Sequence, residues 1–507
     1  MDTQNGEEGS QQQHQRQIVR DFLIKISKTV AKSEKITYNI SKEVFTMLIR
    51  FAVENFLSFK DSTEFCMIAG KMTRHNNHIV TKKGKRILKG AYVFGANASG
   101  KSNLIRAIKF AKDIVTEGVE NINCDKKYFR LQAINRAQPG VFQFDFYSNE
   151  HFYSYGFAVS YVTSSIEEEW LYRIDDKEFC VFLRSKQRNK DSFAVTSDIK
   201  FKEKSQQDRF AVYIEDISSP KMGKTLFLSD VVMRSPDDES EYKPFRDVMS
   251  WFKRLVIVFP ESKYGGITQL LDNDDERTRL ENLLNYFDTG INAVSKKEIE
   301  FDKAFSIFPD RLIDSIKTKM TKQLKKSGQS AFVQHDPSLV EIKNVNGSLM
   351  AYEVVSNHGN DDDLFEYNDE SDGTQRLFDL IPLYQKALKD SVIIVDELDR
   401  SLHTKAAQEF IKYFYSLTEQ TSAQLIATTH DSNIMDLDFI RQDEIWFIER
   451  QSDGSSKLYS LNKFKVRFDK KAEKDYLLGR YGALPIFRQF ALESYPEKED
   501  DLDARKS

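Results

Sequence analysis

The sequence predicts an α/β fold, because short apolar strands alternate with helical segments in two separate parts of the chain. Residues 91–95 (AYVFG) are an apolar run that leads directly into a glycine-rich loop, and residues 101–116 then carry apolar groups at helical spacing. A second group near the carboxyl end comprises helix 374–389, strand 391–396, helix 404–417, strand 423–428 and strand 444–449. Such alternation of strands and helices is typical of α/β proteins.

An antiparallel β region is predicted beside this core. Residues 47–59 (MLIRFAVENFLSF) alternate apolar and polar groups, as a half-buried strand does. Residues 141–161 contain two aromatic runs around Ser148-Asn149-Glu150, which supplies turn chemistry, so they predict a hairpin. Residues 331–356 predict a second hairpin, around Asn346-Gly347.

Composition excludes several classes of protein. At about 100–200 residues per domain, a chain of 507 residues predicts several structural units. The net charge of −4 gives no basic field for nucleic acid or an acidic membrane. The three cysteines, Cys66, Cys124 and Cys180, form no metal or disulfide pattern, which favours a reducing compartment. No run of about 18 apolar residues occurs, and the polar amino terminus is unlike a secretory signal, so the expected location is the cytoplasm, with no membrane partner.

The glycine-rich loop fits the pattern GxxxxGK[ST] at every fixed position. Its glycines let backbone N–H groups surround phosphates, Lys101 supplies a positive charge to the β- and γ-phosphates, and Ser102 offers a hydroxyl to Mg²⁺. The strand before it and the helix after it are the required context. The predicted ATP-binding residues are Gly95, Ala96, Asn97, Ala98, Ser99, Gly100, Lys101, Ser102 and Asn103. ATP and Mg²⁺ are the expected cofactors.

Two further strands end in polar residues with matching chemistry. The strand Val392–Val395 ends in Asp396, predicted to hold Mg²⁺ through water, and Glu397, predicted to polarise the attacking water. The next strand ends at His430, which would sense the γ-phosphate from a position where α/β sheets place ligand groups. Glu397, His430 and Lys101 are therefore the predicted catalytic residues.

A helix is predicted to begin at Ser371-Asp372-Gly373-Thr374-Gln375. Serine and aspartate are good helix caps, and glycine permits a close backbone approach. The segment is either an ordinary cap or an anion site presented to the nucleotide of another molecule.

The order of these motifs resembles the ABC-type ATPase heads shared by SMC-like and RecF-like proteins. It is most similar to bacterial AAA-type, ABC-like ATP-binding proteins of the AbiLi/RloA kind, which occur in phage-defence operons. The matching segments are MLIRFAVENFLSF, GANASGKSNL, SDGTQRL, VDELDRSLH, TTHD, DTGI (288–291) and YLLGRYGALP (476–485). The resemblance covers residues 47–485.

The resemblance implies further roles. Residues 371–375 look like the signature motif that contacts ATP in trans, Asp399 lies in the loop that would cross a dimer interface (D-loop), and Gln132 is a weaker candidate for a Q-loop residue near the metal. The implied partner is a second copy in a head-to-tail dimer or a higher homo-oligomer. SDGTQ in place of the transporters' LSGGQ disfavours transport.

Five segments are expected from these motifs. They are a polar extension at 1–46 with an amphipathic helix at 17–31, a P-loop half with an antiparallel β lobe at 47–162, an α+β and helical insertion at 163–356, a half with the signature and Asp-Glu motifs at 357–490, and an acidic tail at 491–507. The insertion is too short and irregular for a long coiled coil. Its lysine-rich helix near 311–326 is either a solvated face or a contact for nucleic acid or an acidic partner.

Two functions remain open at this point. One is an ATP-driven sensor or regulator in antiviral defence by abortive infection, acting beside a separate nuclease or toxin encoded nearby. The other is a DNA-repair ATPase that clamps DNA. The resemblance favours the first, and the residues after His430 are too few for an appended Toprim nuclease domain. In a third version, ATP mainly holds an assembly together and turns over very slowly.

Overall fold

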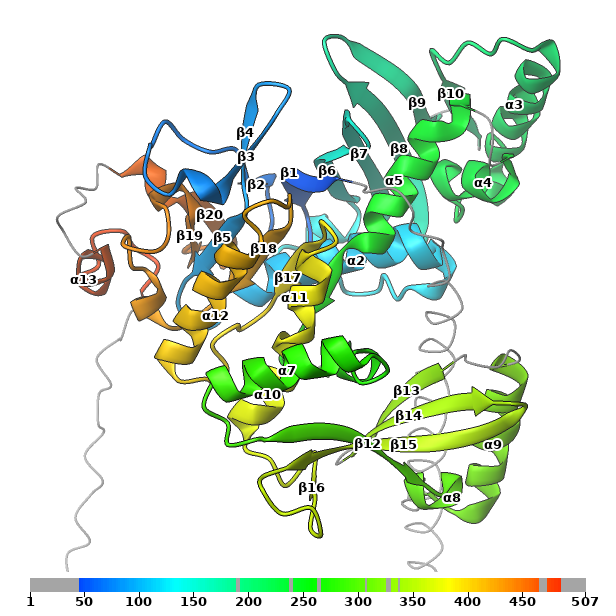
Figure 1. Cartoon of the computed structure of the whole chain (residues 1–507). Helices are drawn as coiled ribbons and strands as arrows, with labels where there is room; N and C mark the ends of the chain where they lie inside the picture. The colour runs from blue at the N-terminus through cyan, green and yellow to red at the C-terminus, as the bar shows by residue number, and fades with distance from the viewer. Residues whose placement is uncertain are drawn as a thin grey trace, which may run out of the picture.

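The computed structural model describes residues 45–187, 192–236, 240–261, 266–305, 308–324, 330–335, 338–464 and 472–484 (Figure 1). The amphipathic helix predicted at 17–31 and the tail at 491–507 lie outside these residues, as does Pro485 at the end of the segment 476–485.

A six-stranded sheet forms the centre of the molecule. Its strand order is β11 (Val256–Val258), β17 (Val392–Val395), β18 (Gln424–Thr428), β5 (Gly90–Phe94), β19 (Ile445–Arg450) and β20 (Ser456–Ser460). The first five strands are parallel, and β20 pairs antiparallel with β19. The predicted α/β fold is therefore confirmed, and its central sheet is mixed.

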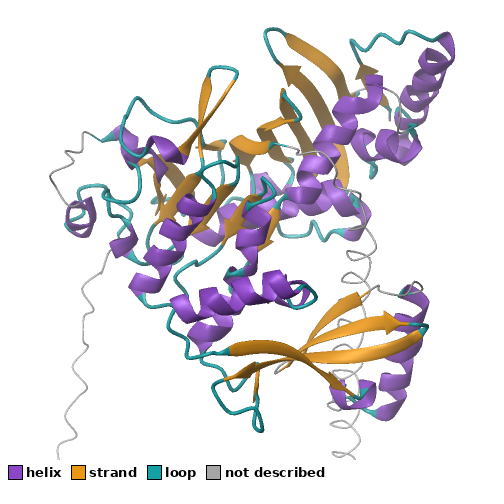
Figure 2. Ribbon diagram, in the orientation of Figure 1, coloured by secondary structure: helices purple, strands orange, loops and turns teal. Residues whose placement is uncertain are grey.

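Successive side chains of β5 point to opposite faces of this sheet and pack into two different cores. Ala91 and Val93 pack into a core that contains helix α2 (Lys101–Glu117), whereas Tyr92 and Phe94 pack into a second core. The helices of that second core are α10 (Asp372–Leu380), α11 (Pro382–Ala387) and α12 (Thr404–Leu417). The sheet is thus covered by helices on both faces, as Figure 2 shows.

A seven-stranded antiparallel sheet shares the first of these cores. Its order is β10 (Phe193–Thr196), β9 (Glu178–Lys186), β8 (Ser165–Ile174), β7 (His151–Ser160), β6 (Gly140–Ser148), β1 (Thr46–Glu54) and β2 (Thr63–Cys66). The predicted hairpin is the β6–β7 pair. Many of the chain's 38 phenylalanines fill this core; Phe146, for example, stacks on Trp251 at a centroid distance of 4.2 Å.

The domain boundaries predicted at residues 162 and 163 need correction. The antiparallel sheet continues through β8, β9 and β10, and β11 belongs to the central sheet. The predicted insertion at 163–356 is therefore not one unit. The consecutive pairs β7–β8, β8–β9 and β9–β10 extend the sheet past residue 162, whereas β11 pairs with β17, a strand so distant in the chain that the pairing leaves no local signal.

The part of the insertion that stands apart is a smaller α+β lobe, called here the β12–β16 lobe. Its sheet has the order β12 (Ala293–Ile299), β15 (Ser348–Asn357), β14 (Ser338–Val345) and β13 (Ser330–His335), with β16 (Phe365–Glu366) beside β15. Helices α8 (Phe301–Ala304) and α9 (Asp310–Gln323) share a separate core with it. This lobe lies below the central sheet in Figure 1.

The remaining elements connect these parts. They are β3 (Ile79–Lys82), β4 (Lys85–Leu88), α3 (Lys204–Ile217), α4 (Phe227–Arg234), α5 (Lys243–Arg254), α6 (Gly266–Leu270), α7 (Asp274–Tyr286), α13 (Ala472–Leu477), and the 3-10 turns at 76–78, 119–121, 133–136, 220–222, 240–242, 432–434, 442–444 and 461–463. Within the described ranges, no helix combines the length and apolar character needed to cross a bilayer.

Candidate functional site

Three loops meet at one edge of the central sheet because β17, β18 and β5 are neighbouring parallel strands. Val395 pairs with Ala427, and Thr428 pairs with Val93, so the strands end at the same level. Their carboxyl ends lie together, where open α/β sheets place their ligands. The loops that follow carry Asp396 with Glu397, Thr429 with His430, and the predicted P-loop.

The P-loop backbone adopts a conformation that needs small residues. Gly100 has a φ of 114°, and Ala98 also has a positive φ, 60°. A Cβ at Gly100 would lie 2.2 Å from Ser456 Oγ, and one at Gly95 would lie 2.3 Å from the carbonyl oxygen of Ile448. Both glycines of the motif are therefore required by contacts with β19 and β20, in addition to the phosphate contacts that the sequence suggested.

Lys101 points back into the loop. Its side chain is almost fully buried, and Nζ donates to the carbonyl of Gly95 at 2.7 Å and to that of Ala96 at 3.2 Å. Nζ also lies 3.3 Å from His430 Nδ1. Burial lowers the pKa of the Lys101 ammonium to about 8, although the nearby carboxylates, first of all Asp396, favour its charged form.

The two predicted carboxylates have different environments. Asp396 is 2 % exposed, and its Oδ1 accepts from Thr428 Oγ1 at 2.6 Å. The same hydroxyl accepts from the backbone N–H of Glu397 at 2.8 Å. The Glu397 side chain is 31 % exposed and reaches to 3.8 Å from His430 Nε2. Asp396 is thus held rigidly, whereas Glu397 faces the solvent side of the cluster.

His430 is positioned by the predicted D-loop residue. Its backbone N–H lies 3.1 Å from Asp399 Oδ2 and 3.3 Å from Oδ1. The imidazole therefore lies between Lys101 on one side and Glu397 on the other. The structure brings together Lys101, Asp396, Glu397, Asp399 and His430, which the sequence had placed in three separate motifs.

The predicted signature segment begins α10, as expected. Ser371 is exposed, and its hydroxyl accepts from the backbone N–H of Thr374 at 3.2 Å, which makes it an N-cap. Gln375 Nε2 donates to the carbonyl of Glu370 at 3.0 Å. The first turn of α10 leaves Ser371 and Asp372 on the surface, so this end of the helix is available to another molecule.

Gln132 is not part of the cluster of five residues described above. It precedes a 3-10 turn at Ala133–Arg136, and its neighbour Leu131 lies against Gly454 in the β19–β20 turn. Its assignment as a Q-loop residue stays a prediction.

Two residues that contact the cluster were not singled out from the sequence. Thr428 bridges the side chain of Asp396 and the backbone of Glu397, and buried Arg376 donates to the carbonyls of both residues. Both stand inside the segments TTHD and SDGTQRL. A hydroxyl at the last position of a buried strand was the available signal for Thr428; a positive charge on the buried face of α10 was the signal for Arg376.

Comparison with known proteins agrees with this geometry. Residues 91–436 match the model of the family described as "AAA domain, putative AbiEii toxin, Type IV TA system". The chain belongs to this family. This family match confirms the prediction that the chain is an ABC-like P-loop ATPase. No curated protein matches the chain.

Solved structures similar to this AbiEii-type chain include SMC heads. An SMC head bound to the C-winged helix domain of ScpA shares 13 % identity, with a TM-score of 0.35 over 82 % of this chain and 98 % of that one. The SMC head domain from Thermotoga maritima shares 12 % identity, with a TM-score of 0.32 over 83 % and 99 %. The strand order of the central sheet and the family match identify the fold as that of a P-loop ATPase.

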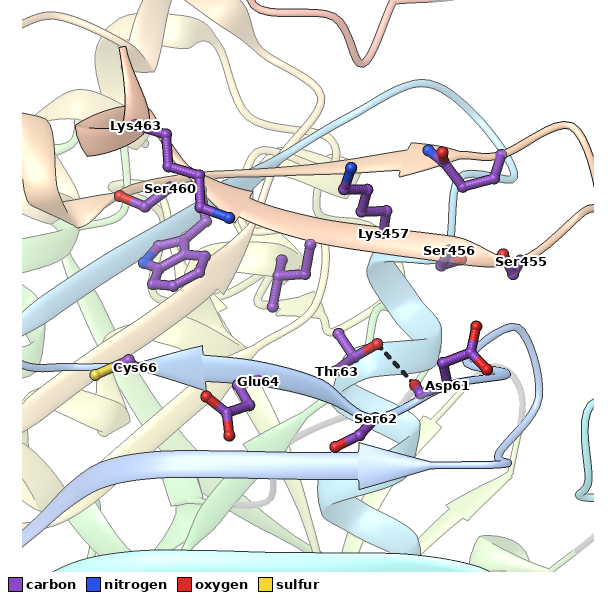
Figure 3. Close-up of a pocket in the computed structure, with 13 residues that line it drawn as sticks. Asp61, Ser62, Thr63, Glu64, Cys66, Ser455, Ser456, Lys457, Ser460 and Lys463 are labelled. Carbon is purple, nitrogen blue, oxygen red and sulfur yellow. Dashed lines mark hydrogen bonds between the residues drawn. The ribbon is translucent and has the colours of Figure 1, made fainter. Parts of the chain in front are cut away.

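A surface groove of about 500 Å³ lies next to the P-loop of this AbiEii-type domain, between β2 and β20 (Figure 3). Lys457 and Lys463 line one wall, and Asp61 and Glu64 line the other. None of the five clustered residues lines it. Its link to the site is Ser456, whose hydroxyl donates to the carbonyl of Ser99 at 2.6 Å.

Proposed function

We propose that this chain binds ATP at residues 95–103 and hydrolyses it with Mg²⁺. The observation that carries the proposal is the convergence of the P-loop, Asp396, Glu397 and His430 at the ends of three adjacent parallel strands. Backbone N–H groups at the start of α2 would bind the phosphates. Lys101 would exchange its bonds to the P-loop carbonyls for bonds to the phosphates.

The residues present fit a magnesium ion. Ser102 offers a half-buried hydroxyl, and Asp396 keeps one carboxylate oxygen free of the Thr428 bond. The described residues contain no group of three or more acidic, His or Cys side chains that could form an all-protein metal site. That suits Mg²⁺, which commonly takes one or two protein ligands and completes its shell with phosphate oxygens and water. The ion would neutralise charge on the β- and γ-phosphates.

Glu397 and His430 are the groups that would act on the attacking water. Glu397 is partly exposed and fixed at its backbone, so its carboxylate can accept a proton from a water beside the γ-phosphate. His430 lies between Lys101 and Glu397 and would sense the γ-phosphate when Lys101 turns toward it.

A second copy would complete the site. Ser371 and Asp372 are exposed at the beginning of α10, where backbone N–H groups attract anions. In a head-to-tail dimer, residues 371–375 would contact the partner's ATP, and Asp399 would lie near the interface. Nucleotide and dimer would then stabilise each other by linkage.

The biological role that fits best is a nucleotide-gated regulator or assembly platform in bacterial anti-phage defence. It would act in the cytoplasm with a separate effector, a nuclease or toxin. Two points support this role: the AbiEii toxin named in the family description, and the resemblance to phage-defence ATPases. The alternative, an SMC-like or RecF-like DNA clamp, predicts tight DNA binding that weakens steeply with salt.

A mixing experiment tests the shared site. Ser371→Asp keeps an N-cap for α10 but places a negative charge where the partner's phosphate would lie. Lys101→Met damages only the phosphate-binding side. Each variant alone should be inactive. After mixing, each heterodimer should have up to about half of the activity of a wild-type dimer, because one of its two composite sites is intact. Phosphate release measures the outcome.

Ser371→Asn is the matched control, because asparagine caps a helix as well as aspartate and adds no charge. It should retain most of the ATPase activity. Full activity of Ser371→Asp, or activity that is independent of protein concentration in a monomer, would contradict the shared site.

ATP binding should also take up a proton above about pH 8. The pKa of free Lys101 is about 8, and bound phosphates favour the ammonium and raise that pKa. At pH 9 much of the free lysine is neutral and must be protonated on binding, so ATP affinity should fall as pH rises above 8. Calorimetry at pH 9 in two buffers with different ionisation enthalpies should give different heats. Equal heats would show that Lys101 stays charged throughout.

A further inference from the structure

Arg376 connects α10 to the turn that carries the predicted general base. Its side chain is 4 % exposed, and one Nη2 nitrogen donates to two backbone carbonyls, that of Asp396 at 3.1 Å and that of Glu397 at 2.9 Å. Among the described residues, Arg376 is the only side chain that donates to these two carbonyls.

The turn itself has an unfavourable backbone conformation. Glu397 has a φ of 48°, in the left-handed region that residues with a Cβ rarely adopt. Such a conformation persists only where the surroundings fix it. Here the N–H of Glu397 donates to Thr428 Oγ1, and its carbonyl accepts from Arg376 and from the backbone N–H of Arg400 at 3.1 Å. Arg376 and Thr428 therefore contact the two peptide units that flank the Cα of Glu397.

The burial of Arg376 is costly in a way that packing alone does not explain. Within the described part of the chain, its Nε and Nη1 have no hydrogen-bond partner although both are buried. Desolvation lowers the pKa of this guanidinium, and Asp379 is the largest opposing influence. An apolar side chain would fill the same space at lower cost, so the two carbonyl bonds are the feature that needs an arginine.

A second contact places α10 against the other end of the same turn. A Cβ at Gly373 would lie 3.0 Å from the carbonyl oxygen of Ser401. Ser401 also has a positive φ, 60°. The first two turns of α10 thus touch the 396–401 segment at both ends, and Arg376 is the only described side chain of α10 that donates to the carbonyls of Asp396 and Glu397.

We propose that Arg376 is a positioning residue for Glu397, which fixes the peptide units on either side of that residue and so aims its carboxylate at the attacking water. This inference rests on the proposed ATPase function. It assigns to the signature helix a task inside its own chain, in addition to the predicted contact with the partner's nucleotide.

Arg376→Met tests the proposal, because methionine keeps most of the aliphatic volume and removes the donors. The kcat for ATP should fall about 10²-fold, the size of effect expected from a small misplacement of a catalytic group. The KM and the equilibrium binding of ATP should change little. Arg376→Lys, which keeps one charged donor, should lie between the wild type and Arg376→Met; a lysine variant no better than methionine would overturn the proposal.

Arg184→Met is a matched control. Arg184 is also fully buried and donates to two backbone carbonyls, Thr225 at 2.6 Å and Met222 at 2.9 Å, but it lies in the antiparallel sheet. The variant Arg184→Met should lower the melting temperature and leave the kcat of the folded protein unchanged. An Arg376→Met variant that loses melting temperature while its kcat is retained would show a purely structural role.

A double-mutant cycle shows whether Arg376 acts through Glu397. In a Glu397→Gln background, Arg376→Met should have almost no further effect on the residual rate, because the base that it positions is already absent. Independent, multiplicative losses would overturn the proposal. Wild-type kcat in Glu397→Gln alone would show that the base is another residue and would also overturn the proposal, whereas a wild-type protein that does not hydrolyse ATP would contradict the proposed function, so the two failures are distinguishable.

Discussion

Glu397→Gln is expected to lower the kcat for ATP by about 10²–10⁴-fold, the usual contribution of a general base. The amide has nearly the same shape as the carboxylate, and the Glu397 backbone bonds to Thr428 and Arg376 do not depend on the side chain. ATP binding should therefore persist, and the ATP-bound dimer should accumulate. Phosphate release gives the rate, and light scattering with and without ATP gives the dimer fraction.

Glu409→Gln is a suitable control for that experiment. Glu409 lies on α12 outside its buried face, where it accepts from Tyr286 at 2.6 Å and from Lys412 at 2.8 Å, and neither partner belongs to the predicted site. It should hydrolyse ATP at the wild-type rate. If Glu397→Gln also does so, the base is another residue.

Lys101→Met is expected to abolish tight ATP binding. Lys101 supplies the side-chain charge of the P-loop, and its Nζ already lies inside the loop, where it donates to the carbonyls of Gly95 and Ala96. Methionine retains the buried volume, so the loss should appear in affinity and not in folding. Equilibrium titration with ATP and Mg²⁺ measures the affinity, and thermal melting checks the fold.

Lys89→Met provides an unusually close control for this variant. Lys89 is also buried, also donates to two backbone carbonyls, those of Thr418 and Glu419, and burial also lowers its pKa to about 8. It caps the end of α12, so its loss should lower the melting temperature and leave ATP affinity unchanged. Equal loss of ATP binding in both variants would mean that Lys101→Met acts through lost stability and not through a lost contact with the phosphates.

The local elements were predictable because their signals are local. Helix α12 begins and ends at the predicted residues 404 and 417, and strands β5, β17 and β18 fall within a residue of their predicted limits. The helix predicted at 374–389 is interrupted between α10 and α11, since Pro382 has no N–H to continue the helical bonding. Strand β12 was missed, because three consecutive charged residues, Lys296, Lys297 and Glu298, interrupt its apolar pattern and its partner β15 is distant in the chain.

The site was predictable as a set of motifs but not as a network. Glycine spacing and carboxylates at strand ends are visible in the sequence, and the adjacency of β17, β18 and β5 brings them together. The roles of Thr428 and Arg376 depend on which backbone atoms they contact, and those contacts follow from three-dimensional packing. The requirement for Gly100 beside Ser456 has the same origin.

The position of β5 in the central sheet also determines when the site can form during synthesis. Both neighbours of this strand, β18 and β19, come from the last quarter of the chain; Leu88 and its partner Gln424 are 336 residues apart. At about 5–20 residues per second, the ribosome needs roughly 15–70 s to make that stretch. The antiparallel hairpin β6–β7 can close within seconds, whereas β5 waits as an unpaired apolar strand. We therefore expect the nascent chain to be unable to bind nucleotide, and to be exposed to aggregation or chaperones, until β18 and β19 have been translated.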